Sequence, residues 1–253
     1  MRVKVGAAML GLTLAANALA ADLKVLTAGA FKPVLTAIAP DFERHSGYRL
    51  VIDNDTGGAL ARRIAAGETF DVVVLPDGAL AQLDKSGKLA PGSSTPMAKI
   101  GIGVAVKRGA PLPDIGSVAA FKRALLDARA VAYIDPAAGG SSGIYLAQLF
   151  DKLGVAAQIE AKAVLVPGGL VAQRVVDGEA DLGVHQISEI LAVPGALLVG
   201  PIPAEIQNYT TYAGGVAASA GDPAAARALL AMLRGDVALK AMRTRGMEAA
   251  TAN

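Results

Sequence analysis

Short apolar runs alternate with amphipathic helical patterns along nearly the whole chain, and this alternation restricts the possible folds more than any other feature. Runs rich in Val, Leu and Ile are typical of strands that are buried on both faces. The predicted strands are Leu23–Ala28, Arg49–Asp53, Asp71–Leu75, Ile100–Lys107, Ala130–Ile134, Ala163–Val166, Asp181–Val184 and Leu197–Val199. The pattern predicts an α/β protein with largely parallel sheets.

Helix signals fill the segments between these strands. Ser117 can cap one helix, and Asp222 followed by Pro223 is a typical helix start. The first connecting segment ends at Gly47 and carries one apolar stripe, formed by Phe31, Val34, Leu35, Ile38 and Phe42. The sequence therefore predicts helices that pack an apolar face against a sheet.

Residues 1–20 have the features of a secretory signal peptide. Arg2 and Lys4 precede an apolar run from Val5 to Ala16, and small residues follow at Ala18-Leu19-Ala20. The apolar run is shorter than the roughly 18 residues that a membrane span needs. We expect cleavage near Ala21 and a periplasmic protein with no transmembrane helix in the mature chain. The chain has no cysteine, so we expect no lipid anchor and no disulfide.

The charge balance argues against nucleic acid or anionic lipid as a partner. Two of the 24 basic residues, Arg2 and Lys4, lie in the predicted signal peptide, so the rest of the chain carries 22 basic against 22 acidic residues. Aromatic residues make up 4% of the chain and Trp is absent, so stacking platforms for bases are not expected either.

Four small-residue loops follow predicted strands, and each opens a helix. In an open α/β sheet ligands bind beyond the carboxyl ends of the strands, where glycine N–H groups and helix starts favour an anion. The stretch DPAAGGSSG at residues 135–143 is the richest loop, and Ser141 or Ser142 can cap the helix after it. The predicted ligand-binding residues of these loops are Gly29, Ala30, Thr56, Gly57, Gly58, Gly140, Ser141, Ser142, Gly168 and Gly169. Taken singly, each of these loops can also be interpreted as an ordinary Gly/Ser loop without a ligand.

The chain resembles type II periplasmic solute-binding proteins, and most of all the molybdate-binding branch of ATP-driven importers. Three segments carry the resemblance: LKVLTAGAFKPVLTAIAPDFERHSG from Leu23, TGGALARRIAAGETFDVVVLPD from Thr56, and DPAAGGSSGIYLAQLFDKLG from Asp135. The resemblance implies two lobes joined by a hinge that close over a small anion, and docking on an ABC permease in the inner membrane. We expect a monomer without a cofactor, with residues 21–103 and 213–253 in one lobe and 104–212 in the other.

Departures from the pattern of this branch bear on the ligand. Ala30 stands where a hydroxyl is usual, Thr56-Gly57-Gly58 replaces a serine-rich loop, and GVHQISE at 183–189 lacks a tyrosine that holds the oxyanion in similar proteins. A hydrogen bond to a charged group is worth about 1.5–3 kcal/mol, so several lost donors weaken oxyanion binding strongly. We therefore expect an organic carboxylate rather than molybdate, with His185 and Gln186 also in contact with it.

An enzyme is the alternative to a binding protein. Some exported proteins that resemble this branch are aconitate isomerases, and for that chemistry His185 or Glu189 is the natural base. A packed strand-end side chain is the alternative role for His185, and a first-turn helix residue favoured by the dipole is the alternative for Glu189. Both alternatives favour a binding protein without chemistry. With two histidines far apart in sequence and no cysteine, the chain carries no metal-ligand motif.

Overall fold

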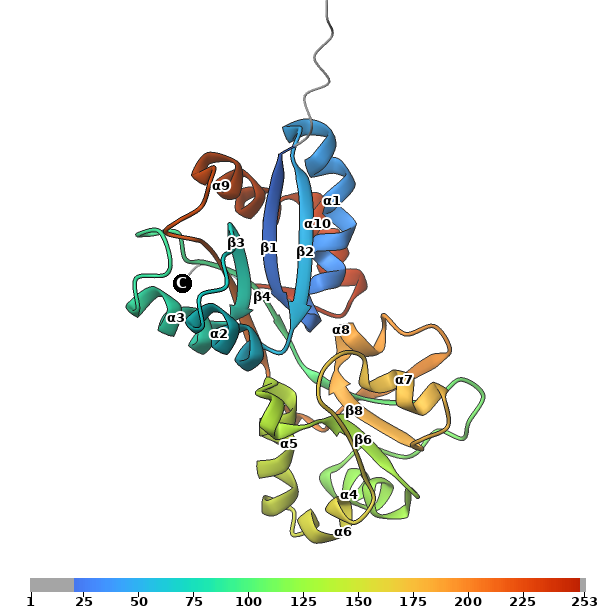
Figure 1. The fold of residues 1–253 in the computed structure, drawn as a ribbon. Helices are drawn as coiled ribbons and strands as arrows, with labels where there is room; N and C mark the ends of the chain where they lie inside the picture. The colour runs from blue at the N-terminus through green and yellow to red at the C-terminus, as the bar shows by residue number, and fades with distance from the viewer. Residues whose placement is uncertain (1–20, 251–253) are drawn as a thin grey trace, which may run out of the picture.

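The computed structural model describes residues 21–250, and the predicted signal peptide at residues 1–20 lies outside this part. The described chain forms two lobes, each built on its own β-sheet (Figure 1). The predicted α/β class and the two-lobed architecture are confirmed. Among the described residues, no helix combines the length and the apolar character needed to cross a membrane.

The first lobe contains a six-stranded mixed sheet. Its strands, in the order in which they pair, are β11 (Glu248–Ala249), β4 (Thr95–Ile100), β10 (Thr210–Val216), β3 (Val72–Pro76), β1 (Asp22–Ala28) and β2 (Arg49–Asp55). β1 pairs in parallel with β2 and β3, whereas β10 is antiparallel to β3 and β4. Its helices are α1 (Lys32–Ser46), α2 (Gly57–Ala65), α3 (Asp77–Lys85), α9 (Pro223–Met232) and α10 (Asp236–Thr244).

The second lobe contains a five-stranded mixed sheet. Its strands, again in pairing order, are β7 (Ala163–Val166), β6 (Val131–Ile134), β8 (Leu182–Gln186), β5 (Ile102–Lys107) and β9 (Ala196–Pro201). β6 is parallel to β7 and β8, and β5 is antiparallel to β8 and β9. Its helices are α4 (Val118–Asp127), α5 (Ser141–Lys152), α6 (Ala156–Glu160), α7 (Val171–Val176) and α8 (Ile187–Ile190).

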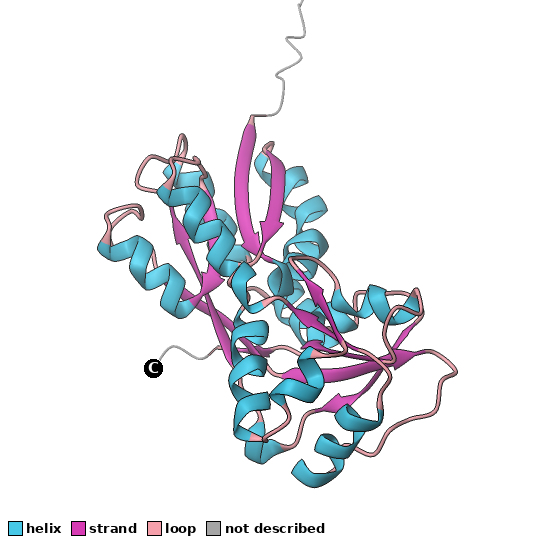
Figure 2. Ribbon diagram, turned by 60° about the horizontal axis from the view of Figure 1, so that its bottom comes forward, coloured by secondary structure: helices cyan, strands magenta, loops and turns pink. Residues whose placement is uncertain are grey.

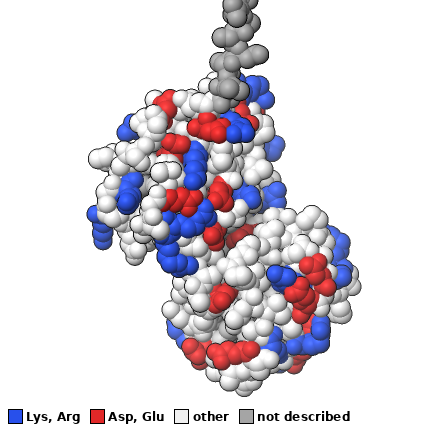
Figure 3. All heavy atoms as spheres, viewed as in Figure 1, with Lys and Arg blue, Asp and Glu red and all other residues white. Residues whose placement is uncertain are grey.

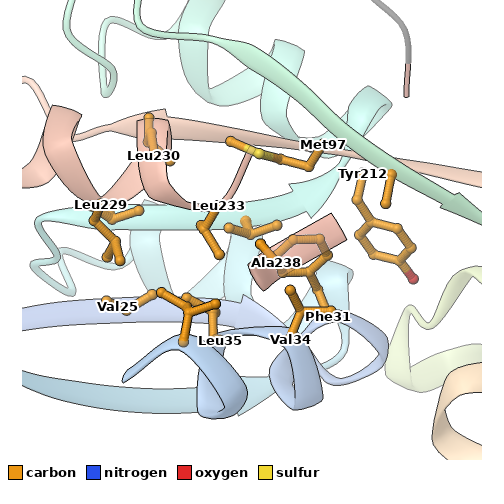
Figure 4. Close-up of a cluster of buried hydrophobic side chains, with 14 of the residues drawn as sticks. Val25, Phe31, Val34, Leu35, Met97, Tyr212, Leu229, Leu230, Leu233 and Ala238 are labelled. Atoms are coloured by element: carbon orange, nitrogen blue, oxygen red, sulfur yellow. The ribbon is translucent and has the colours of Figure 1, made fainter. Parts of the chain in front are cut away.

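Each sheet is buried on both faces, as the apolar strands predict (Figure 2). Side chains alternate between the faces of a strand, so Val25 of β1 packs with α1, α9 and α10 whereas Leu26 packs with α2 and α3. Figure 4 shows the first of these clusters, with Phe31 and Leu35 facing Leu233 and Ala238. Tyr212 lies at its edge, and its hydroxyl points away from the cluster.

The chain passes from the first sheet to the second at Gly101, between β4 and β5. The sequence predicts a single strand over Ile100–Lys107. The structure has two strands instead, because β4 begins at Thr95 and pairs with β10. β11 pairs only with Lys99 and Ala98, so Pro96 occupies a stretch of β4 where its missing N–H donor is tolerated.

The chain returns to the first lobe between β9 and β10, and Gln207 joins the two crossings there. Its Oε1 accepts from the Ile102 N–H at 2.8 Å and its Nε2 donates to the Ile102 carbonyl at 2.9 Å. The exact lobe boundaries at 103/104 and 212/213 stay a prediction. Figure 3 shows the narrow region between the lobes, and basic and acidic side chains are interspersed on the face shown.

Candidate functional site

A small cavity lies between the lobes, at the carboxyl ends of β1, β2, β6 and β8. Its volume is about 30 Å³, and a buried water needs about 10–15 Å³ by this measure. In this conformation the lobes are therefore closed, and a ligand of several carbon atoms has to enter while they are apart. We call this space the inner cavity.

The structure brings most of the predicted ligand-binding residues together around the inner cavity. Those that line it are Gly29, Ala30, Thr56, Gly57, Gly140, Ser141, Ser142, Gly169, His185 and Gln186. Gly58 and Gly168 stand outside the lining: the Gly58 N–H donates to the Gly139 carbonyl at 3.0 Å, and Gly168 faces Asp55. The strand-end loops converge as expected, and the part that each residue takes in binding stays a prediction.

Ser141 has a different contact from the helix cap that the sequence suggested. α5 begins at Ser141 with Gly140 in the cap position, and neither of its serines caps the helix. Instead the Ser141 Oγ accepts from Gln186 Nε2 at 3.2 Å and from Thr210 Oγ1 at 3.1 Å. Gln186 Nε2 also donates to Thr210 Oγ1 at 2.9 Å, so this network ties the second lobe to the returning strand β10.

His185 and Glu189 form a buried pair in the wall of the inner cavity. His185 is the last residue but one of β8, and Glu189 lies in the short helix α8 that follows. Their side chains are 3% and 9% exposed, and His185 Nε2 lies 3.3 Å from Glu189 Oε2. Two buried side-chain atoms of the site, His185 Nδ1 and Gln186 Oε1, have no hydrogen-bond partner among the described residues. They are therefore available to a ligand.

Burial shifts the pKa values of this pair in opposite directions. It raises the pKa of Glu189 to about 8 and lowers the pKa of His185 to about 3, because a low-dielectric site penalises the charged form of each group. A carboxyl group whose pKa lies near neutrality can both accept and return a proton under physiological conditions. Such shifts in a cleft are typical of functional sites.

The raised pKa of Glu189 predicts a pH-dependent stability. The usual pKa of 4.5 applies in the unfolded chain and about 8 in the folded one, so stability is highest below pH 4.5 and is lost as pH rises towards 8. The loss amounts to at most about 1.4 kcal/mol per pH unit. Glu189→Gln removes this contribution. In urea unfolding, the free energy of unfolding of the variant should therefore rise relative to that of the native protein between pH 5 and 8. A constant difference across that range contradicts the shift.

Direct contacts between the lobes hold the cavity closed. Thr56 Oγ1 donates to the Ala138 carbonyl at 2.5 Å, and Ser188 Oγ donates to the Ala30 carbonyl at 2.9 Å. Glu189 also reaches across, since a Cβ on Gly29 would lie 2.5 Å from its Oε1. A side chain at position 29 would therefore displace that carboxyl group from its place against the loop.

Three polar residues of the lining were absent from the sequence prediction: Asn54, Asp55 and Tyr212. Asn54 and Asp55 end β2 directly before Thr56, so their position at a strand end was a usable signal. Tyr212 had no such signal, because it comes from β10, which reaches the site only through the return crossing. Burial, followed by the charge of Glu189, raises the pKa of Tyr212, so its phenol stays a neutral donor.

Fold and cavity together define a class, that of two-lobed binding proteins. The structure is similar to the periplasmic molybdate-binding protein of Azotobacter vinelandii, with a TM-score of 0.77 and 23% identity over 90% of this chain and 100% of that one. It is also similar to a periplasmic thiamin binding protein, with a TM-score of 0.72 and 17% identity over 96% of this chain and 88% of that one. Residues 23–248 match the bacterial extracellular solute-binding proteins, and the chain belongs to this family.

One curated relative is an enzyme. The chain is 38% identical over 232 residues to an aconitate isomerase from Pseudomonas sp, which covers 89% of this chain and 87% of that protein.

Proposed function

We propose that this protein is an isomerase that moves a carbon–carbon double bond within an unsaturated tricarboxylate such as aconitate. The observation that carries the proposal is the buried His185–Glu189 pair in the wall of the interlobe cavity. The similarity to an aconitate isomerase supports the substrate class. A carboxyl group whose pKa is raised to about 8 and that faces the cavity can exchange a proton with a bound carbon acid, which a site that only binds an anion does not need.

The reaction is a proton transfer within one molecule. Glu189 takes a proton from the methylene carbon, the electron pair forms a new double bond to the central carbon, and the former double bond becomes a single bond. Glu189 then returns a proton to the carbon at the far end of that bond. One proton leaves and one returns, so the reaction needs no oxidant or co-reactant, and rotation about a single bond permits the change between trans and cis forms.

His185 has a separate task in this scheme. Its Nε2 lies 3.3 Å from Glu189 Oε2 and holds the carboxyl group in place, while its neutral ring adds no competing charge. Negative charge develops on the substrate carboxylates as the proton leaves, and fixed donors stabilise it. The N–H groups of the loops at Gly29, Gly57 and Gly140 and the hydroxyl of Ser142 line the same cavity and can supply these donors.

Proton NMR tests the proposal. The purified protein is mixed with trans-aconitate in deuterated buffer, and we expect cis-aconitate to form together with loss of the methylene signal by deuterium exchange. Heat-denatured protein and buffer alone are the controls. If neither isomer formation nor exchange exceeds the controls at millimolar substrate, the chain is not an aconitate isomerase.

Capture of a small carboxylate for an ABC importer is the second candidate. Membership of the extracellular solute-binding family favours it, as does the position of the cavity between two lobes that can close. On this account the protein works as a periplasmic monomer that docks on a permease in the inner membrane. A thermal shift with aconitate itself, without exchange or isomerisation, would favour the receptor over the enzyme, because ligand at 100 times Kd adds about 2.7 kcal/mol of stability.

A further inference from the structure

A second, larger space adjoins the inner cavity on the other side of Glu189. This outer groove has a volume of about 540 Å³, and its wall includes Lys32, Pro33, Asn54, Leu170, Glu189 and Arg245. Gly29, Asn54, Gly169 and Glu189 border both spaces. The two spaces are therefore neighbours that meet at these four residues.

The charges of the two spaces differ. The described lining of the inner cavity includes the carboxyl groups of Asp55 and Glu189 and neither Lys nor Arg. The outer groove has two cationic side chains, Lys32 and Arg245. A tricarboxylate carries up to three negative charges, and a cavity of about 30 Å³ without a cationic side chain cannot receive all of them.

The two cations come from the first and the last helix of the first lobe and are held at the groove by hydrogen bonds. Lys32 begins α1, and its Nζ donates to Asn54 Oδ1 at 2.7 Å, in the wall that the two spaces share. Arg245 follows α10, and its Nη1 donates to the carbonyl of Leu191 in the second lobe at 3.1 Å. A guanidinium has five N–H donors, so this bond leaves others for a carboxylate.

We infer that Lys32 and Arg245 bind a carboxylate of the substrate in the outer groove, while the carbon that exchanges its proton lies at Glu189. The inference rests on the proposed function for its substrate class. It makes the pair the determinant that distinguishes a tricarboxylate from a dicarboxylate. Arg245 also bonds Leu191 of the second lobe, so its guanidinium takes this position when the lobes are together.

Calorimetric binding of unreactive analogues tests this. The probe is tricarballylate, the saturated tricarboxylate, compared with glutarate and methylsuccinate, each of which has one carboxylate fewer. The double variant Lys32→Ala, Arg245→Ala should bind tricarballylate at least about tenfold more weakly, because bonds to charged groups are lost. At least one of the two dicarboxylates should be affected much less. Lys85→Ala, Arg243→Ala removes the same charge from groups outside the groove and should bind tricarballylate as the native protein does.

The outcomes separate this inference from the proposed function. Equal weakening for all three ligands would mean that the pair acts only on lobe closure, and an unchanged affinity for tricarballylate would mean that it does not touch the ligand; either overturns the inference. Failure of the native protein to prefer tricarballylate over both dicarboxylates overturns it as well. Selective binding that depends on Lys32 and Arg245, without turnover of aconitate, would leave the inference standing and refute the isomerase. Turnover of aconitate with an unchanged KM in the double variant would support the isomerase and overturn the inference.

Discussion

Glu189→Gln should lower the rate of aconitate isomerisation by about 10²–10⁴-fold, the usual contribution of a general base. The amide has the shape of the protonated carboxyl group, so the contact with Gly29 and the approach to His185 are preserved. It cannot take up the substrate proton. The measurement is the initial rate of cis-aconitate formation by NMR, combined with calorimetric binding of tricarballylate.

Glu205→Gln is the matched control, because Glu205 is exposed and lies in the second lobe away from the cavity. It should keep the native rate. The Glu189 variant should still bind the analogue, which separates loss of chemistry from loss of binding. A Glu189→Gln protein that isomerises at the native rate would remove Glu189 from the mechanism. His185→Gln should also be slower, since the carboxyl group loses its fixed partner.

Gly58→Ala should weaken ligand binding and turnover by on the order of 10²-fold, because displaced lobes misplace the reacting groups. A Cβ at Gly58 would lie 2.8 Å from the Gly139 Cα and 2.9 Å from its carbonyl oxygen. Both neighbours are backbone atoms of the other lobe and cannot turn aside. The hydrogen bond from the Gly58 N–H to the Gly139 carbonyl, 3.0 Å in the closed protein, is lost as well.

Gly78→Ala is the control for this change. Gly78 is the second residue of α3 as Gly58 is the second of α2, and a Cβ there meets no atom within 4 Å. Alanine favours a helix over glycine by about 1 kcal/mol, so neither variant should be less stable. X-ray scattering with saturating tricarballylate should give a larger radius of gyration for Gly58→Ala than for Gly78→Ala. Equal radii and equal affinities would show that this contact does not limit closure.

The alternation of strands and helices was predictable because its signals are local. A buried strand needs apolar side chains on both faces, and Val25 and Leu26 of β1 meet this need in the two clusters on either side of the sheet. The strand-end loops at Gly29, Thr56 and Gly140 were predictable for the same reason, since in such folds a ligand lies beyond the carboxyl ends of strands. β4 was missed because Pro96 is a poor strand residue and is accepted only where its partner strand is short.

The sequence by itself determined the α/β class, the strand-end loops that surround the cavity, and His185 and Glu189 as the two groups able to move a proton. It left open whether these two residues have a structural or a catalytic role. The sequence pattern of a glutamate at a helix start is the same whether the side chain faces water or a cavity. Only the tertiary structure decided the environment of Glu189. The two lobes bury it against Gly29 and His185, and this burial raises the pKa of its carboxyl group. Likewise Tyr212, Lys32 and Arg245 reach the site from segments far apart in the chain, and their meeting depends on how the lobes pack rather than on any local pattern.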